Sequence, residues 1–218
     1  CADPTATVTD DKGRAFYLFE DNSGNQALVQ TTLTQIIHGT AGDDTVTLQN
    51  RPIIYYGDAG NDTISGGTGN DVIYGGIGND TLRGGSGTNT LYGGDGNDIL
   101  YVDSVTDTPY GDAGTDRIIL GDGTSGVTFS KASFTKISGG SGTDTLELHG
   151  ANNILNLTGL SGDKLTSIEV IDIRGTGGNS IVLDATLLTA DTGREAGGPL
   201  TILGNAGNSY QLTGTGWT

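Results

Sequence analysis

Residues 57–101 read GDAGNDTIS-GGTGNDVIY-GGIGNDTLR-GGSGTNTLY-GGDGNDILY, which is five copies of one nine-residue unit without a gap. Two further copies, GTAGDDTVT from Gly39 and GDAGTDRII from Gly111, lie in the same frame. The segments 48–56 and 102–110 have lost the glycines but keep the length, so residues 39–119 make nine consecutive nonamers. A short fixed period of this kind predicts a stack of similar structural units, each contacting its neighbours.

Each nonamer predicts a tight loop followed by a strand of about three residues. Side chains alternate along a strand, so position eight points inward while positions seven and nine point outward. Position eight is aliphatic in the clear copies: Val46, Ile64, Ile73, Leu82, Leu91, Leu100 and Ile118. Two units close one coil of 18 residues, and we therefore expect an all-β stack of such coils, a β-solenoid, with about 4.8 Å between coils.

The loops carry an acid at position six and glycines at positions one, two and four. The acids of the array are Asp44, Asp62, Asp71, Asp80, Asp98, Asp107 and Asp116. The glycines are Gly57, Gly60, Gly66, Gly67, Gly69, Gly75, Gly76, Gly78, Gly84, Gly85, Gly87, Gly93, Gly94, Gly96, Gly111 and Gly114. Calcium takes about six to eight oxygens from carboxylates and carbonyls, and glycines let a tight loop turn its carbonyls toward one ion. The loops therefore predict several bound Ca2+ ions, the alternative being simple turn formation.

The nonamers closely resemble the calcium-binding repeats of RTX (hemolysin-type) proteins. This resemblance implies a right-handed parallel β-roll with Ca2+ between successive loops on each edge. It also implies type I secretion, so we expect a secreted protein that is extracellular or lies on the bacterial cell surface.

An 18-residue coil makes the two edges of the roll different. One edge carries an unbroken column of acids, namely Asp44, Asp62, Asp80, Asp98 and Asp116. The other edge carries, in order, Ile53, Asp71, Asn89 and Asp107. Because Ile53 offers no ligand and Asn89 only a neutral carbonyl, we expect strong calcium sites on the first edge and weak or absent sites on the second.

The charge of the chain predicts that calcium binding is coupled to folding. The 218 residues carry a formal charge of −16, of which the array supplies −9 from twelve Asp and three Arg. Without cations such a stretch repels itself, and its inward aliphatic residues are too few to fold it alone. The acidity argues against nucleic acids and anionic membrane surfaces as partners, and no stretch suits a membrane span.

The flanking segments predict caps and an altered continuation. Residues 1–38 lack the repeat, and strands at 15–19 and 27–29 indicate an N-terminal β cap or the end of a preceding domain. Residues 120–138 interrupt the frame as an insertion. The single cysteine, Cys1, permits no internal disulfide and is either a lipidated first residue or a boundary of the sequence.

Nonamers resume at Gly139 with GGSGTDTLE, whose Asp144 is a further candidate ligand, and run in register to Leu183. Acids become rare and aliphatic residues frequent in this part. We expect residues 139–218 to form a calcium-poor continuation of the roll with a C-terminal cap, held by packing; the alternative is a separate small β-domain.

The segments LTSIEVIDIRGTGGNSIVL, from Leu165, and LTILGNAGNSYQLTGTGW, from Leu200, are similar to the C-terminal regions of very large bacterial repeat adhesins. Those adhesins usually have Gly-Asp-x-Gly-Asp where this chain has Asn205 and Asn208, and the loss of both acids argues against calcium there. Their sequence continues past the tryptophan, so we expect this chain to be a piece of a longer protein.

A column of tyrosines marks one outward face of the predicted roll. Tyr56, Tyr74, Tyr92 and Tyr110 each occupy position nine, 18 residues apart. Stacked aromatic side chains stabilise neighbouring strands; the alternative is a docking strip for sugar rings or a partner protein.

No enzyme is predicted. The chain lacks G-x-S-x-G and H-E-x-x-H motifs, and His38 and His149 are isolated. We expect an extracellular calcium-binding structural or adhesion module, as part of an adhesin, surface-layer or filament protein, that folds on Ca2+ after secretion. Its partners would be calcium and surface glycans or other copies of itself. The alternative is a non-catalytic folding and secretion domain of a secreted hydrolase or toxin.

Overall fold

The computed structural model describes residues 35–121, 123, 128–130, 135–159, 164–184 and 200–213, together with three strands nearer the N-terminus. The chain divides into two compact units, Cys1–Gln35 and Ile36–Thr218. In the first unit, β1 (Ala6–Thr9), β2 (Ala15–Glu20) and β3 (Gln26–Gln30) form an antiparallel sheet in that order. The two strands expected there are present, while the capping role stays a prediction. Cys1 lies outside the described residues.

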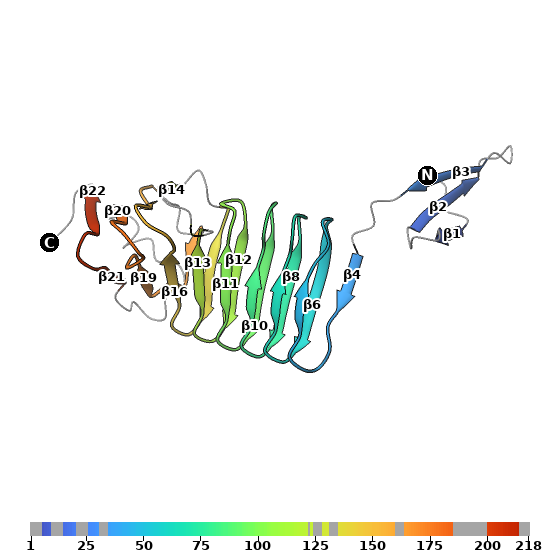
Figure 1. Ribbon diagram of the computed structural model, residues 1–218, viewed down its shortest axis with the longest axis horizontal. Coiled ribbons are helices and arrows are strands. Elements are labelled where there is room, and N and C mark those ends of the chain that lie inside the picture. Colours follow the sequence, from blue (N-terminus) through green and yellow to red (C-terminus); the bar gives the residue numbers. More distant parts are fainter. Residues whose placement is uncertain are drawn as a thin grey trace. The chain divides into compact units, whose positions relative to one another are not determined.

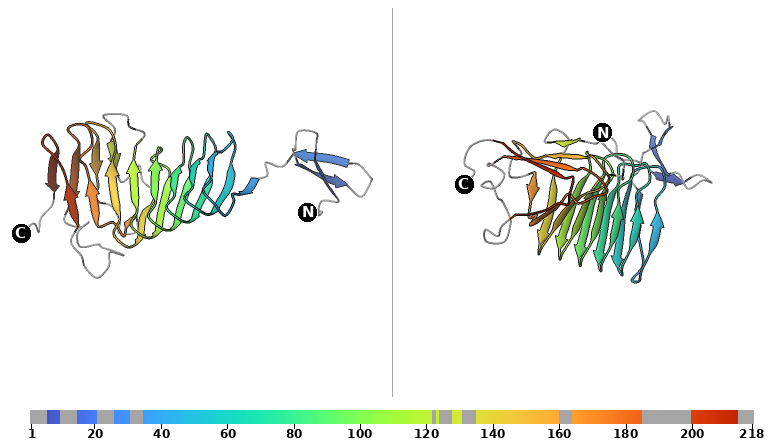
Figure 2. Two further views of the ribbon diagram at one scale, coloured as in Figure 1. Left: turned by 60° about the horizontal axis from the view of Figure 1, so that its bottom comes forward. Right: turned by 60° about the vertical axis from the view of Figure 1, so that its left-hand side comes forward.

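Two long parallel sheets build the second unit, and the chain alternates between them (Figures 1 and 2). Sheet 1 contains β4 (Gln35–His38), β6 (Ile53–Ala59), β8 (Val72–Ile77), β10 (Thr90–Asp95), β12 (Thr108–Ala113), β15 (Ile137–Ser141) and β18 (Leu165–Thr166). Sheet 2 contains β5 (Thr45–Thr47), β7 (Thr63–Ser65), β9 (Thr81–Arg83), β11 (Ile99–Val102), β13 (Arg117–Leu120), β16 (Thr145–Leu148), β19 (Val170–Asp172) and β21 (Thr201–Leu203). The predicted all-β parallel β-roll is confirmed.

The coil of the array is 18 residues long, as the sequence predicts. Tyr56 pairs with Tyr74 and Tyr92 with Tyr110 in sheet 1, and Ile64 pairs with Leu82 in sheet 2. The segments 48–56 and 102–110, which lack the glycines, keep this register because their length is unchanged.

Position eight of the nonamers forms the core between the two sheets. Ile64, Ile73, Leu82, Leu91, Leu100 and Ile118 are each at most 1% exposed. The glycine-containing nonamers thus bury little besides this one aliphatic position, while the segments without the glycines add Leu48, Ile53 and Val102 to the core. Packing alone therefore holds neighbouring coils weakly.

The coil becomes longer after Leu120, where a third sheet begins. Sheet 3 contains β14 (Thr128–Ser130), β17 (Ile154–Asn156), β20 (Ser180–Asp184) and β22 (Ser209–Thr213). Tyr110 pairs with Ser138, Thr145 with Val170 and Ile154 with Ser180, so the coils span 28, 25 and 26 residues. The predicted nonamer register to Leu183 is therefore wrong, because each coil gains a third strand with its own connections.

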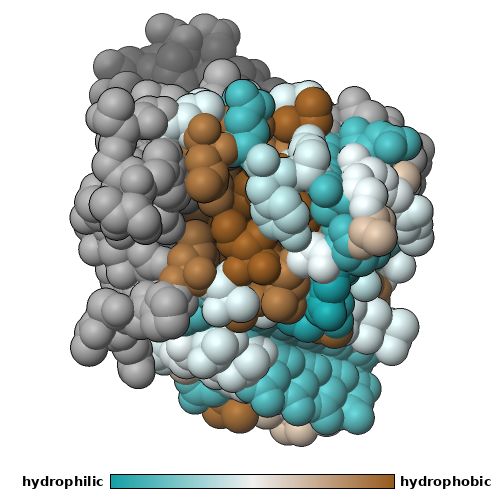
Figure 3. Space-filling model, turned by 90° about the vertical axis from the view of Figure 1, so that its left-hand side faces the viewer, coloured by the Kyte–Doolittle hydropathy of each residue, from teal (hydrophilic) through white to brown (hydrophobic). Residues whose placement is uncertain are grey.

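The larger coils enclose a wider apolar core. Leu146, Leu155, Ile171 and Ile181, from sheets 2 and 3, are fully buried. Sheets 1 and 2 run from the array into this part without a break, as β12 pairs with β15 and β13 with β16. Apolar residues gather at the centre of the face shown in Figure 3. In β22, Tyr210 and Leu212 are about half exposed.

Candidate calcium-binding edges

Two rows of loops connect the sheets of the array. Loops that lead from sheet 1 to sheet 2 make the first edge, and loops that return from sheet 2 to sheet 1 make the second edge. The glycine loops that begin at Gly57, Gly75, Gly93 and Gly111 lie on the first edge, and those that begin at Gly66 and Gly84 lie on the second. The first edge brings six acids into one column: Asp44, Asp62, Asp80, Asp98, Asp116 and Asp144.

Hydrogen bonds between coils fix one oxygen of each acid in the column. The backbone N–H of Asp62 donates to Oδ1 of Asp80 at 2.7 Å, and that of Asp80 donates to Oδ1 of Asp98 at 2.7 Å. The same bond, at 2.8 Å, links Asp44 to Asp62, Asp98 to Asp116 and Asp116 to Asp144. The column therefore crosses the longer coil of residues 111–139 without losing its alignment.

Beyond Asp44, the second oxygen of each acid in the column has no hydrogen-bond partner among the described residues. This is true of Oδ2 of Asp62, Asp80, Asp98, Asp116 and Asp144, whose side chains are at most 1% exposed. Burial is the main cause that raises the pKa of Asp80 and Asp116 to about 6 and the pKa of Asp98 and Asp144 to about 7. A buried carboxylate oxygen without a partner is costly, so the column requires cations or protons.

Backbone carbonyls face these unpartnered oxygens. A Cβ atom on Gly57 would lie well inside 3.0 Å of both Oδ2 of Asp62 and the carbonyl oxygen of Gly75 in the next coil. Gly75 lies in the same way against Asp80 and the carbonyl of Gly93. Position one is therefore glycine because there is no room for a side chain, whereas positive φ angles explain glycines such as Gly76 (119°) and Gly78 (139°).

The donor set of the first edge suits calcium. Among the residues that the structure describes, no three His, Cys, Asp or Glu side chains gather as a metal-binding group. Carbonyl oxygens must therefore complete any coordination shell, and an all-oxygen shell of carboxylates and carbonyls is typical of Ca2+. Position-six carboxylates and loop carbonyls of neighbouring coils would hold each ion and join the two coils.

At the start of the column, the carboxylate of Asp44 is already engaged. Asp44 is half-buried, and its Oδ2 accepts a hydrogen bond of 2.7 Å from the backbone N–H of Thr40. Its environment therefore differs from that of the buried acids that follow it.

The second edge has fewer unpartnered carboxylate oxygens. Oδ1 of Asp71 accepts from the N–H of Ile53 at 2.9 Å, and only its Oδ2 has no partner in the described structure. Both oxygens of Asp107 are used, because they accept from the N–H groups of Asn89 (2.8 Å) and Ser104 (3.1 Å). The edges are thus unequal in the predicted direction, although their occupancy by metal stays a prediction.

Amides take over the role of acids beyond the array. Oδ1 of Asn179 accepts from the N–H of Asn153 at 2.9 Å, as an acid does in the column. The amide nitrogen of Asn179 donates to the carbonyls of Gly150 and Ile173 at 3.2 and 3.3 Å, and that of Asn153 donates to the carbonyl of His149 at 2.6 Å. An amide N–H thus meets carbonyls without a cation, which is consistent with the calcium-poor character expected here.

Sequence reasoning missed one acid at the end of the column. The N–H of Asp144 donates to Oε2 of Glu169 at 2.8 Å. Glu169 falls at position four of the predicted nonamer frame rather than at position six, so the repeat gave no signal of this contact.

The tyrosine column is present on the outer face of sheet 1. The rings of Tyr56, Tyr74, Tyr92 and Tyr110 stack with centroids 4.6–4.9 Å apart and planes within 6° of parallel. His38 stacks on Tyr56 at 4.7 Å. Neighbouring rings cover one another's faces, so the column offers ring edges and hydroxyl groups to a ligand rather than a flat aromatic surface.

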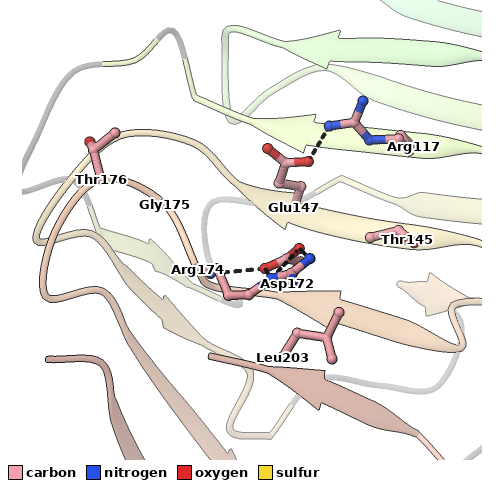
Figure 4. Close-up of a pocket in the computed structure, with 8 residues that line it drawn as sticks. All are labelled: Arg117, Thr145, Glu147, Asp172, Arg174, Gly175, Thr176 and Leu203. Carbon is pink, nitrogen blue, oxygen red and sulfur yellow. Dashed lines mark hydrogen bonds and ion pairs between the residues drawn. The ribbon is translucent and has the colours of Figure 1, made fainter. Parts of the chain in front are cut away.

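A pocket on the outer face of sheet 2 contains two paired carboxylates (Figure 4). Glu147 accepts from Arg117 at 2.5 Å, and Asp172 accepts from Arg174 at 2.6 Å. Glu147 and Asp172 are neighbours on adjacent strands. Hydrogen bonds and charge from Arg174 hold the pKa of Asp172 below its ordinary value despite partial burial, which is opposite to the shift expected of a general acid.

Comparison with known families supports the assignment of the loops. The family model of the RTX calcium-binding nonapeptide repeat (four copies) matches residues 33–48, 56–91, 74–109 and 136–162. The loop of Asp116 lies between these matches but shares the column. No curated protein matches the chain. The resemblance to adhesins expected from Leu165 onward is not shown, because these segments lie outside the matched residues.

Proposed function

We propose that this chain, which contains a calcium-binding RTX repeat domain, is a non-catalytic structural or adhesion module. It would fold when it binds Ca2+ outside the cell. RTX repeat domains are typical of secreted bacterial proteins. The part of the chain that the structure describes has no helix that could cross a membrane.

The column of unpartnered carboxylate oxygens on the first edge carries this proposal. Asp62, Asp80, Asp98 and Asp116 repeat one environment, in which a buried Oδ2 faces the glycine carbonyl of the next coil. Two electron-rich oxygens that lie beside the same glycine repel each other, and a cation between the loops would convert that repulsion into attraction. Calcium would therefore stabilise the contact between coils, and the array would open without it.

Coupled folding suits a protein that leaves the cell unfolded. Cytosolic calcium is scarce and extracellular calcium is abundant, so the acidic array would remain open during export and close afterwards. The binding free energy of the ions would then contribute directly to the free energy of folding.

The non-catalytic assignment rests on the state of the candidate acids. The buried carboxylates belong to the calcium column, and the two carboxylates of the pocket on sheet 2 are paired with arginines. Neither set is arranged as a general acid beside a general base, so we propose a structural role for both.

Calcium titration of the purified chain tests the proposal. Circular dichroism should show a large gain of β-signal between chelator and millimolar Ca2+, and size-exclusion chromatography should show compaction. Mg2+ is the matched control, because it prefers a smaller octahedral shell and keeps its water. A chain that is already fully folded in chelator would overturn the proposal.

A non-catalytic folding domain of a secreted hydrolase or toxin is the second candidate, because the same repeats would serve it equally well. The calcium-loaded chain can separate the two. Self-association in sedimentation, or retention on immobilised surface glycans, supports the structural or adhesion module. A monomer without either interaction supports the folding domain.

A further inference from the structure

The acid column of the first edge does not end with the last repeat loop. Asp144 is fully buried, and its Oδ2 has no hydrogen-bond partner in the described structure. Its N–H donates to Oε2 of Glu169, whereas each earlier acid donates to Oδ1 of the next Asp. Glu169 therefore takes the next place in the column, although it follows 25 residues later rather than 18.

A carbonyl oxygen completes the likeness to the repeat loops. A Cβ atom on Gly139 would collide with both Oδ2 of Asp144 and the carbonyl oxygen of Ser167. In the preceding loop, Gly111 lies in the same way against Asp116 and the carbonyl of Gly139. Ser167 has a φ of 53°, unlike the position-one glycines, whose φ is not positive. Its carbonyl nevertheless takes the place that a repeat glycine carbonyl takes in the preceding coils.

The chain reaches this arrangement through a shorter loop. Six residues lead from Gly139 to Asp144, whereas only Ser167, Ile168 and Glu169 make the corresponding connection. Glutamate is one methylene longer than aspartate, and this reach brings its carboxylate to the N–H of Asp144. The absence of a repeat sequence is thus offset by a longer side chain.

We propose that Asp144, Glu169 and the carbonyl of Ser167 hold a Ca2+ ion that closes the column beyond the last repeat. This inference rests on the proposed calcium-binding function and adds two ligands, Ser167 and Glu169, that lie outside the matched repeats. The local charge fits a cation, because Asp116 and Glu169 both add negative potential at Asp144.

This closing site should bind calcium more weakly than the repeat sites. The short loop lacks the glycines of positions two and four, so it presents fewer carbonyl oxygens to an ion. Water would have to fill the remaining positions of the shell, as is common for Ca2+. The site therefore fills after the sites between the repeat loops.

Counting bound ions tests the proposal. We expect Glu169→Gln to bind one ion fewer than the unaltered chain in equilibrium dialysis, or to lose the weakest phase in calorimetry. Gln keeps an oxygen that can accept from the N–H of Asp144, so the array should still fold in millimolar Ca2+. Glu147→Gln is the matched control, because Glu147 lies on the outer face of β16. The calcium titration of this variant should match that of the unaltered chain.

The outcomes are distinguishable. If the unaltered chain binds no calcium, the proposed function itself fails. If the unaltered chain binds calcium and Glu169→Gln gives the same stoichiometry and affinities, only the closing site is overturned. Should Glu169→Gln fail to fold, Glu169→Asp keeps the charge but shortens the reach; loss of one ion or weakening of the last phase supports the site, and an unchanged titration overturns it.

Discussion

Single residues at position one of the loops control how closely two coils approach. Gly75 lies between the carboxylate of Asp80 and the carbonyl of Gly93, and its backbone conformation does not require glycine. The sequence shows a glycine there, but only the structure shows that space, rather than backbone conformation, selects it.

We expect Gly75→Ala to destabilise the calcium-loaded roll by about 1–3 kcal/mol, because the added methyl group overpacks a site that cannot expand. Calcium affinity should fall as well, since the methyl group separates two ligand oxygens. Thermal unfolding in calcium measures the first effect and calorimetry the second.

Gly42→Ala is the control for this substitution. No atom lies within 4 Å of a Cβ at Gly42, and its φ is not positive. The control should therefore unfold at the same temperature as the unaltered chain, and equal behaviour of the two variants would contradict the crowding argument.

At the scale of the element, the two edges of the array differ in their free oxygens rather than in their shape. Both edges use the same hydrogen bond between coils, for example from Asp62 to Asp80 and from Ile53 to Asp71. The second edge keeps the unpartnered Oδ2 of Asp71, but Asn89 is an amide and Asp107 binds its own loop through Ser104.

We expect Asp80→Asn to reduce the number or affinity of bound Ca2+ ions, because the amide keeps the hydrogen bond of Oδ1 but removes the charge and the free Oδ2. Asp107→Asn should leave calcium binding nearly unchanged, since neither oxygen of Asp107 is available. Equilibrium dialysis of both variants tests this. Equal losses from the two variants would show that the edges bind metal equally.

The tyrosine column is a second element whose role can be separated from calcium binding. Tyr74→Ala with Tyr92→Ala removes the three ring contacts of the column, and each cross-strand aromatic pair contributes about 0.2–1 kcal/mol. We expect lower thermal stability with an unchanged number of bound ions. Tyr101→Ala, on the other sheet, is the control.

A loss of binding or self-association without a loss of stability would instead support the docking strip. In that case the partner must recognise ring edges and hydroxyl groups. The stacking of the rings leaves no broad aromatic face for a sugar ring within the column.

At the scale of the whole molecule, the burial of the acid column links folding to pH. The pKa values of Asp80, Asp98, Asp116 and Asp144 are raised to about 6 or 7 in the folded chain, whereas they return to ordinary values when the chain unfolds. The folded state therefore binds more protons, so its stability without calcium falls as pH rises through this range.

We expect the calcium-free chain to gain β-signal when the pH is lowered from about 8 to about 5, because protons then neutralise the column. The calcium concentration needed to fold the chain should also depend on pH, because protons and calcium compete for the same oxygens. Circular dichroism in metal-free buffer measures the first effect. A β-signal that does not change over this range would contradict the argument.

The regularity of the chain decided how much of the molecule could be predicted. The array was predictable to the residue because one period fixes the inward position, the coil length and the acid column together. The part after Leu120 was not, because residues such as Leu146 and Ile171 repeat an aliphatic pattern while insertions change the coil length. Glu169 and Ser104 act through local geometry, which leaves no mark in a repeat.

The contacts between neighbouring coils also give the array mechanical properties. These contacts are the hydrogen bond between successive acids and the carboxylate and carbonyl oxygens that lie beside each position-one glycine. In the calcium-loaded array, an ion would tie each coil to its neighbours at one edge, and the ring stack joins the coils that carry the tyrosines at the face of sheet 1. Tension along the stack would load these ties in series. A chain pulled from its ends would release one coil at a time. Each 18-residue coil would lengthen the chain by about 60 Å at roughly 3.4 Å per residue, and the force at each step would be set by the surrounding calcium.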